Sequence, residues 1–398
     1  MENKNLQKLN LRLKSLTVFR ELLDDDVIRA LCNYLDCAAG GDEMSSVPAY
    51  SEFVSCLYKT DSADLAVHVK DIAENNENVY VRLIGRGKEP DDYMKKAVEE
   101  DLKTLQAVAD ITPEELKNGQ DFLPGFSSCK VDIAGDFNHR VKNISKYGYG
   151  LYARNHMFYI DSENRIVPVK NPDSISLENL IDYERERKVI LDNTVALLEG
   201  KPAANILLTG DAGTGKSSTV KAVANRLYKE GLRIIEIRKE QLSQIPGILD
   251  ELAVNPLKFI LFIDDLSFQK DDDNFNALKA VLEGSVSAKS GNVVIYATSN
   301  RRHIIKEKFS DREGDDIHRN DTVQEIISLS ERFGIHVTFQ KPDKSTFLHI
   351  VHHLAEENGI AMDEDEIDLL AERFALERGG RSARLARQFI DNLITKTK

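Results

Sequence analysis

Long apolar runs and an excess of basic charge are both missing from this chain of 398 residues. A membrane-spanning helix needs ~18–20 consecutive apolar residues, and the run at 259–263, for example, has only five. Residues 1–16 are polar and lack the apolar centre of a signal peptide. These absences argue against an integral membrane protein, and they predict a cytoplasmic protein with no membrane partner.

Cysteine is also scarce. The four cysteines, Cys32, Cys37, Cys56 and Cys129, have no CxxC spacing and all lie in the N-terminal half. This pattern favours reduced thiols packed in a protein interior over a metal or redox centre.

The net charge of −13 argues against a protein that coats nucleic acid. One segment departs from this balance, because residues 371–398 hold five Arg and two Lys against two Glu and one Asp, a local balance of +4. Two interpretations stay open for it. It is either a charged helical surface with one nucleotide-facing arginine, or a surface that contacts the phosphates of DNA or RNA.

The pattern of apolar and polar residues divides the chain into three expected domains. Residues 1–172 form an N-terminal module of mixed α+β character and no assigned role, with a β-hairpin predicted around 157–169. Residues 173–340 alternate short apolar runs with helical patterns, as in a doubly wound α/β domain. Its candidate parallel strands are 205–209, 232–237, 259–263, 293–297 and 336–339. Residues 341–398 show three helical stripes, which predict a small helical domain.

A phosphate-binding loop follows the first of these strands. Residues 210–217 read Gly-Asp-Ala-Gly-Thr-Gly-Lys-Ser, which fits the pattern GxxxxGK[ST] and opens an amphipathic helix. Glycine lets the backbone take positive φ and approach a phosphate, while successive N–H groups and the helix dipole attract the anion. The predicted nucleotide-binding residues of this loop are Gly210, Asp211, Ala212, Gly213, Thr214, Gly215, Lys216, Ser217 and Ser218.

Lys216 is expected to reach the β- and γ-phosphates of ATP, and the hydroxyl of Ser217 is expected to bind Mg²⁺. The partner acids end the strand at 259–263, as Asp264 and Asp265. Parallel strands present their carboxyl ends to one crevice. Asp264 is therefore predicted to complete the Mg²⁺ site, and Asp265 to act as general base on the attacking water.

From these residues the segment 173–398 resembles the AAA+ ATPases, which implies a five-stranded parallel P-loop sheet followed by a helical lid. More narrowly, it resembles a bacterial family of AAA+ ATPases catalogued as a domain of unknown function. The segments that carry this resemblance are the GKSS loop, the IDDLSF strand, the ATSNRRH turn, the SERFGI box and the GGRSARLARQF helix.

The resemblance also implies roles for further residues. Tyr183 is expected to touch adenine, Asn300 to act as sensor 1, and Arg332 to serve as an arginine finger on a neighbour's nucleotide. Arg384 is the expected sensor 2, with Arg381 as the alternative. A finger that acts across subunits implies a homo-oligomer, as a ring or an arc, with a hexamer among the options.

One departure affects the expected function. Most AAA+ proteins carry Asp-Glu where this chain carries Asp264-Asp265, and aspartate is one methylene shorter. The sequence predicts an ATP hydrolase that remodels or regulates a protein or nucleic-acid client. The alternative is a slow nucleotide-dependent switch or loader with little motor activity.

Overall fold

The computed structural model describes residues 2–40, 43–117, 119–266, 273–283, 291–300 and 331–396. The chain divides into two compact units, Met1–Arg154 and Asn155–Lys398. Within the described residues, no helix combines the length and the apolar character needed to cross a bilayer.

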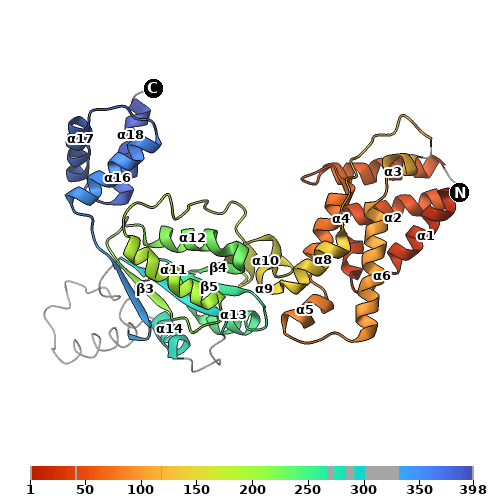
Figure 1. Ribbon diagram of the computed structural model, residues 1–398, viewed down its shortest axis with the longest axis horizontal. Helices are drawn as coiled ribbons and strands as arrows, with labels where there is room; N and C mark the ends of the chain where they lie inside the picture. The colour runs from red at the N-terminus through yellow and green to blue at the C-terminus, as the bar shows by residue number, and fades with distance from the viewer. Residues whose placement is uncertain are drawn as a thin grey trace. The chain divides into compact units, whose positions relative to one another are not determined.

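The first unit is helical throughout its described part (Figure 1). Its largest inter-helix contact joins α2 and α3, and buried apolar side chains from most of its helices form one core. The buried carboxylate of Asp101 accepts backbone N–H bonds from Thr17, Val18 and Phe19 at 2.8–3.1 Å, which fixes the chain between α1 and the first 3₁₀ turn. The elements of this unit are α1 (Glu2–Lys14), η1 (Arg20–Asp24), α2 (Asp26–Ala39), α3 (Glu43–Tyr58), α4 (Leu65–Glu74), α5 (Val79–Gly85), α6 (Asp92–Ala109), α7 (Pro113–Lys117), α8 (Ile133–Lys142), α9 (Ile144–Tyr147) and α10 (Leu151–Arg154).

The second unit is built on a seven-stranded sheet with the order β2-β1-β4-β5-β6-β3-β7. All neighbouring strands are parallel except the β1–β2 pair. The five predicted strands are confirmed as β3 to β7, with ends that differ by a residue or two. The strands are β1 (Met157–Ile160), β2 (Ile166–Pro168), β3 (Ile206–Gly210), β4 (Leu232–Ile237), β5 (Lys258–Ile263), β6 (Val293–Ser299) and β7 (Ile335–Phe339).

The predicted hairpin exists as β1 and β2, but it belongs to this sheet and not to the N-terminal module. Met157 of β1 pairs in register with Ile234 of β4, so the hairpin extends the sheet from five strands to seven. The second unit therefore begins at Asn155, earlier than the expected boundary at 172. Because β1 and β2 belong to the second unit, the described part of the N-terminal module contains helices where a mixed α+β module was expected.

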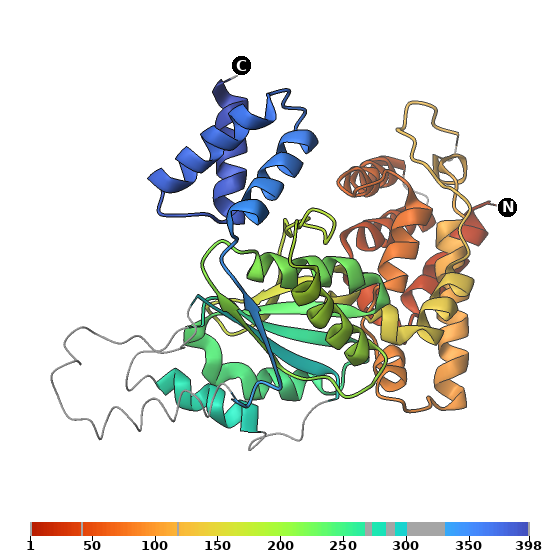
Figure 2. The same cartoon turned by 60° about the vertical axis from the view of Figure 1, so that its left-hand side comes forward.

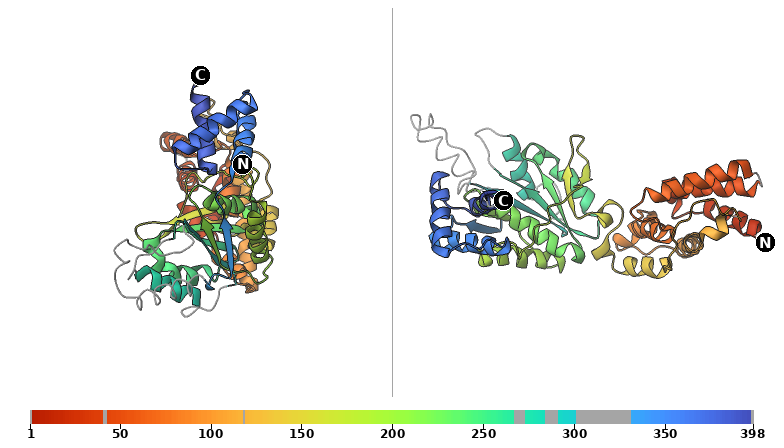
Figure 3. Two further views of the ribbon diagram at one scale, coloured as in Figure 1. Left: turned by 90° about the vertical axis from the view of Figure 1, so that its left-hand side faces the viewer. Right: turned by 90° about the horizontal axis from the view of Figure 1, so that it is seen from above.

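Helices cover both faces of the sheet, which confirms the doubly wound α/β fold. Buried residues of α11 (Glu184–Leu198) and α12 (Lys216–Leu227) form one core with alternate residues of the strands. Figure 2 shows α13 (Ile245–Leu252) and α14 (Asp273–Glu283) on the other face, and the two helix layers flank the sheet again in the left view of Figure 3. Short 3₁₀ turns, η2 (Tyr228–Glu230) and η3 (Lys239–Gln244), flank β4.

The chain ends in three helices, α16 (Lys344–Glu357), α17 (Glu364–Glu377) and α18 (Ala383–Lys396). The apolar stripes predicted from the sequence meet in one core, where Phe347, Ile367 and Phe389 are almost fully buried. Ile181, from the segment before α11, also packs against this core. These helices form the predicted helical lid.

Candidate active site

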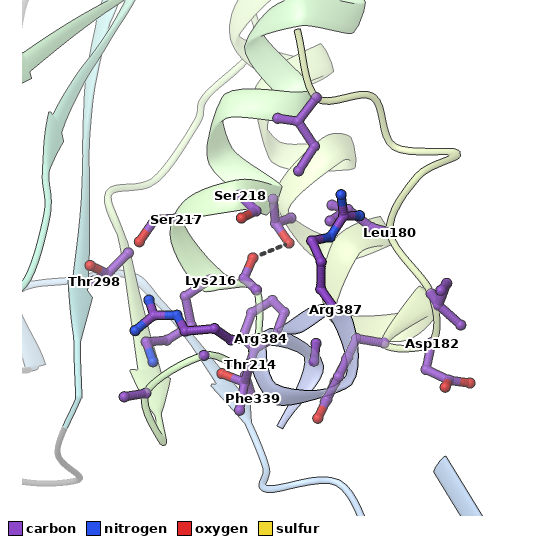
Figure 4. Close-up of a pocket in the computed structure, with 18 of the residues that line it drawn as sticks. Leu180, Asp182, Thr214, Lys216, Ser217, Ser218, Thr298, Phe339, Arg384 and Arg387 are labelled. Atoms are coloured by element: carbon purple, nitrogen blue, oxygen red, sulfur yellow. Dashed lines mark hydrogen bonds between the residues drawn. The ribbon is translucent and has the colours of Figure 1, made fainter. Parts of the chain in front are cut away.

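A cavity of about 530 Å³ lies where the carboxyl edge of the sheet meets the lid. It is lined by residues of the segment 175–183, the loop after β3, the starts of α11 and α12, the ends of β5, β6 and β7, and the helices α16 and α18. Figure 4 shows side chains from the loop and from α18 converging on this space. Its volume falls within the ~300–1,000 Å³ that is usual for small-molecule sites.

The loop after β3 needs glycine at three positions. Gly210 has φ of 138°, and a Cβ there would lie 2.0 Å from the carbonyl oxygen of Phe339. Gly213 has φ of 78° and packs against Ser382 and Arg384 of the lid. Gly215 has φ of 93° and directly precedes α12. The predicted glycine roles therefore have a structural basis in both backbone conformation and close packing.

The N-terminus of α12 has no side-chain cap. Gly215 occupies the cap position, and no side chain bonds the first N–H groups of the helix. Because these groups have no acceptor within a helix and carry the positive end of its dipole, they attract an anion. The first residues of α12, Lys216 to Thr219, line the cavity.

Lys216 is buried, and the hydrogen bonds of its ammonium group go to neutral acceptors among the described residues. Its Nζ donates to the carbonyl oxygens of Gly210 at 2.8 Å and Asp211 at 2.7 Å, and to Oδ1 of Asn300 at 3.1 Å. Burial has the largest effect on the pKa of Lys216 and lowers it, while nearby carboxylates raise it and the guanidinium of Arg384 lowers it. The ammonium group and this guanidinium lie on the same cavity as the start of α12, and together these positive groups favour an anionic ligand.

A hydroxyl and a carboxylate meet beside the lysine. Ser217 Oγ donates to Oδ1 of Asp264 at 2.6 Å, and Thr298 Oγ1 donates to the same oxygen at 2.6 Å. Carboxylate and hydroxyl oxygens are ligands that suit Mg²⁺, which binds few protein groups and keeps several waters. The residues predicted to hold the metal, Ser217 and Asp264, therefore fit it in both position and chemistry.

Asp265 and Asn300 form a second polar pair at the same edge. Asn300 Nδ2 donates to Oδ1 of Asp265 at 2.7 Å, while the backbone N–H of Asp265 donates to Thr298 Oγ1 at 2.9 Å. Asp265 has φ of 55°, a left-handed conformation that is uncommon outside glycine, asparagine and aspartate. This turn aims the Asp265 carboxylate into the cavity, which both residues line.

The segment before α11 lines the other end of the cavity. Asp182 and Tyr183 have φ of 59° and 62°. The Tyr183 ring packs 5.3 Å from that of Phe339, and its hydroxyl donates to the carbonyl oxygen of Gln340 at 2.6 Å. Burial is the main cause that raises the pKa of Tyr183 to about 12, so the phenol stays a neutral donor. An apolar wall of this kind suits a planar base.

The two candidate sensor arginines have different surroundings. Arg384 lines the cavity, and its backbone N–H donates to Gly213 at 3.2 Å. Arg381 instead forms a two-pronged ion pair with Glu372, with bonds of 2.7 and 2.5 Å. The structure thus brings Arg384, and not Arg381, to the phosphate loop.

Arg332 does not lie in the cavity of its own chain. It forms an ion pair with Glu283 at the end of α14, and the described residues that line the cavity do not include it. Its action on another subunit's nucleotide stays a prediction. Parts of three family segments, residues 267–268, 301–303 and 330, lie outside the described residues.

Thr298 and Arg387 are among the lining residues that were given no role from the sequence. Thr298 hydrogen-bonds to both acids, since its Oγ1 donates to Asp264 and accepts from the backbone N–H of Asp265. Its position two residues before Asn300, at the end of a predicted strand, could have indicated this role. Arg387 lines the cavity from α18, and its signal was the spacing of three residues from Arg384, which puts both on one helix face.

Comparisons with known proteins give a family and a set of distant structures. No match was found among curated proteins. The solved structure of the Thermotoga maritima RuvB Holliday junction branch migration motor matches with a TM-score of 0.36 and 16% sequence identity. The match covers 53% of this chain and 61% of that chain. Two mutants of that motor give TM-scores of 0.36 and 0.37 at 16% identity, each with 62% of its chain covered.

This chain thus spans less than two thirds of the length of these solved structures. The family model described as "Protein of unknown function (DUF815)" matches residues 153–397, more than half of the chain. That match covers the whole sheet, the cavity and nearly all of the lid, and the chain belongs to this family.

Proposed function

We propose that the second unit binds ATP together with Mg²⁺ and hydrolyses it. The observation that carries this proposal is the buried ammonium of Lys216, which donates to two loop carbonyls and lies on the same cavity as the Ser217–Asp264 pair. A triphosphate offers negative charge to this ammonium and to the N–H groups at the start of α12, and the hydroxyl–carboxylate pair supplies metal ligands.

In this proposal the loop amides and Lys216 hold the phosphates, with Lys216 turned from its carbonyl acceptors toward the β- and γ-phosphates. Ser217 and Asp264 hold Mg²⁺, which supplies charge neutralisation at the transferring phosphate. Tyr183 and its neighbours hold the base. The domain that performs these steps spans residues 173–340, and residues 341–398 act as its lid.

Asp265 acts as the general base that takes a proton from the attacking water, and Asn300 orients that water or the γ-phosphate. Their hydrogen bond of 2.7 Å supports a shared task, because each holds the other at the edge of the cavity. A positioned base of this kind contributes ~10²–10⁴-fold to a rate.

Arg332 acts on the nucleotide of a neighbouring subunit. Its place outside the cavity of its own chain supports this. Arg332 must leave Glu283 to reach a second copy, because the two residues form an ion pair within one chain. A repeated head-to-tail contact of this kind builds a ring or an arc, with a hexamer among the closed forms.

The proposed ATPase activity has two candidate functions. The first is remodelling of a protein or nucleic-acid client, with the helical first unit as the module that contacts it. The second is a slow switch or loader, and the short side chain of Asp265, whose Oδ1 accepts a hydrogen bond from Asn300, favours slow turnover. A cytoplasmic location remains part of the proposal.

Steady-state ATP turnover and oligomer mass, each measured with and without a non-hydrolysable analogue, test the proposal. Turnover well below ~1 s⁻¹ together with nucleotide-dependent assembly indicates the switch, because kinases and stimulated GTPases that use this chemistry run at ~1–100 s⁻¹. Faster turnover that a client stimulates indicates the motor. No turnover and no nucleotide binding contradicts the proposal altogether.

A further inference from the structure

Two arginines of the lid, Arg384 and Arg387, line the nucleotide cavity. Arg384 and Arg387 are three residues apart on α18, so they share one face of the helix. Both line the cavity and both are exposed. Among the described residues no carboxylate or carbonyl pairs with either guanidinium, whereas the nearby Arg381 is bound to Glu372.

The two side chains reach different ends of the cavity. Figure 4 shows Arg384 on the side of Lys216, and the backbone N–H of Arg384 donates to the carbonyl oxygen of Gly213 in the same loop. Figure 4 shows Arg387 on the side of Ser218 and Leu180, away from Lys216. The helix separates the two Cα atoms by ~4.5 Å along its axis, so each guanidinium can hold a different group of one elongated ligand.

The order of the phosphates along the loop assigns those groups. A phosphate loop places its lysine at the β- and γ-phosphates, and its backbone amides cradle the α- and β-phosphates. Ser218 follows the serine that is suited to bind the metal, so its amide is placed for the α-phosphate. Arg387, which Figure 4 shows toward the Ser218 side of the cavity, therefore faces the part of the nucleotide that ATP and ADP share.

We propose, on the basis of the proposed function, that Arg387 binds the α-phosphate and sets the affinity for ATP and ADP alike. Arg384 lies toward the γ-phosphate and favours ATP over ADP. Arginine suits both positions, because its planar fork gives two parallel bonds to phosphate oxygens. The lid thus holds ADP through Arg387 even after the γ-phosphate has left.

Calorimetric titration of the full chain with ADP and with ATPγS, both with Mg²⁺, tests this assignment. Four variants are compared with the unaltered chain: Arg387→Gln, Arg387→Lys, Arg384→Gln and the control Arg373→Gln. Arg373 is an exposed residue of α17 that pairs with Glu377 and does not line the cavity. Unfolding midpoints confirm that each variant is folded, and since Arg387 is exposed, its replacement leaves the lid core in place.

Arg387→Gln is expected to lower the affinities for ADP and for ATPγS by the same factor. This factor is about tenfold, which corresponds to the loss of one hydrogen bond to a charged group. Arg387→Lys keeps the charge and recovers part of the loss. Arg384→Gln lowers the affinity for ATPγS more than the affinity for ADP, and Arg373→Gln changes neither affinity. Unchanged affinities in Arg387→Gln, or a loss confined to ATPγS, would overturn the assignment while nucleotide binding by the unaltered chain upholds the proposed function. If the unaltered chain binds neither nucleotide, both fail.

Discussion

The hydroxyl of Ser217 lies 2.6 Å from Oδ1 of Asp264, although 47 positions separate the two residues in the chain. The loop after β3 supplies one and the end of β5 supplies the other, and β6 lies between these strands in the sheet. Thr298, from the end of β6, donates to the same oxygen and bridges the gap. Three strand ends therefore build one oxygen-rich site.

Replacement of Asp264 tests that site. Asp264→Asn keeps an acceptor for Ser217 and Thr298 but loses the charge that a metal needs. We expect nucleotide affinity without Mg²⁺ to stay close to that of the unaltered chain, and the gain in affinity on adding Mg²⁺ to disappear. Titrations with and without the metal measure both quantities. The control is Asp192→Asn on the exposed side of α11, and an Asp264→Asn chain that still responds to Mg²⁺ like this control would contradict the assignment.

Replacement of Lys216 tests the anion site. Lys216→Ala removes the buried ammonium, and we expect ATP affinity to fall ~100-fold or more, since bonds to charged groups are worth ~1.5–3 kcal/mol and this lysine makes several. Lys221→Ala is the matched control, because Lys221 lies on the same helix and pairs with Glu236. Micromolar ATP affinity retained in Lys216→Ala would count against the phosphate loop.

Arg332 and Asp265 are tested together. Arg332→Ala and Asp265→Asn are each expected to bind ATP normally and to lose turnover, by ~10³-fold or more for the arginine. If the finger acts across subunits, mixing the two inactive chains restores part of the activity, because some interfaces then combine an intact base with an intact arginine. Steady-state ATPase assays of the mixtures measure this. If mixtures of the two variants are as inactive as each variant alone, the proposal that Arg332 acts across subunits is wrong.

Gly210 provides a test of the fold around the loop. In Gly210→Ala the new Cβ must meet the carbonyl oxygen of Phe339, at a φ that side chains rarely adopt. We expect a loss of ~2 kcal/mol or more in the free energy of unfolding. Gly247→Ala in α13 is the control, since a Cβ there meets nothing within 4 Å, and it is expected to stabilise the chain by ~0.5–1 kcal/mol. Denaturant unfolding curves compare the two, and equal stabilities would contradict the packing at Gly210.

The loop, the five strands β3 to β7 and the lid were predictable because each leaves a local pattern in the sequence. Gly210 to Ser217 follow a strand and open a helix, and Asp264 follows a strand of buried apolar residues. Strand β1 was recognised as part of a hairpin, yet its pairing with β4 was not predicted, because periodicity identifies a strand and not its neighbour. Met157 and Ile234 are in register across 77 positions of sequence.

The role of Arg387 illustrates a second limit. A sequence shows five arginines between 371 and 398, and all of them suit a charged helical surface. Which of them faces the nucleotide depends on how α18 is rotated against the loop, and the contact between Arg384 and Gly213 fixes that rotation. Arg381 precedes α18 and pairs with Glu372.

Titration of the unaltered full chain with ATPγS, with and without Mg²⁺, tests the central claim most directly. The account predicts saturable binding at one site per chain that Mg²⁺ tightens. Absence of saturable binding up to millimolar nucleotide, or binding indifferent to the metal, would contradict the claim that Lys216 and the Ser217–Asp264 pair form one nucleotide site.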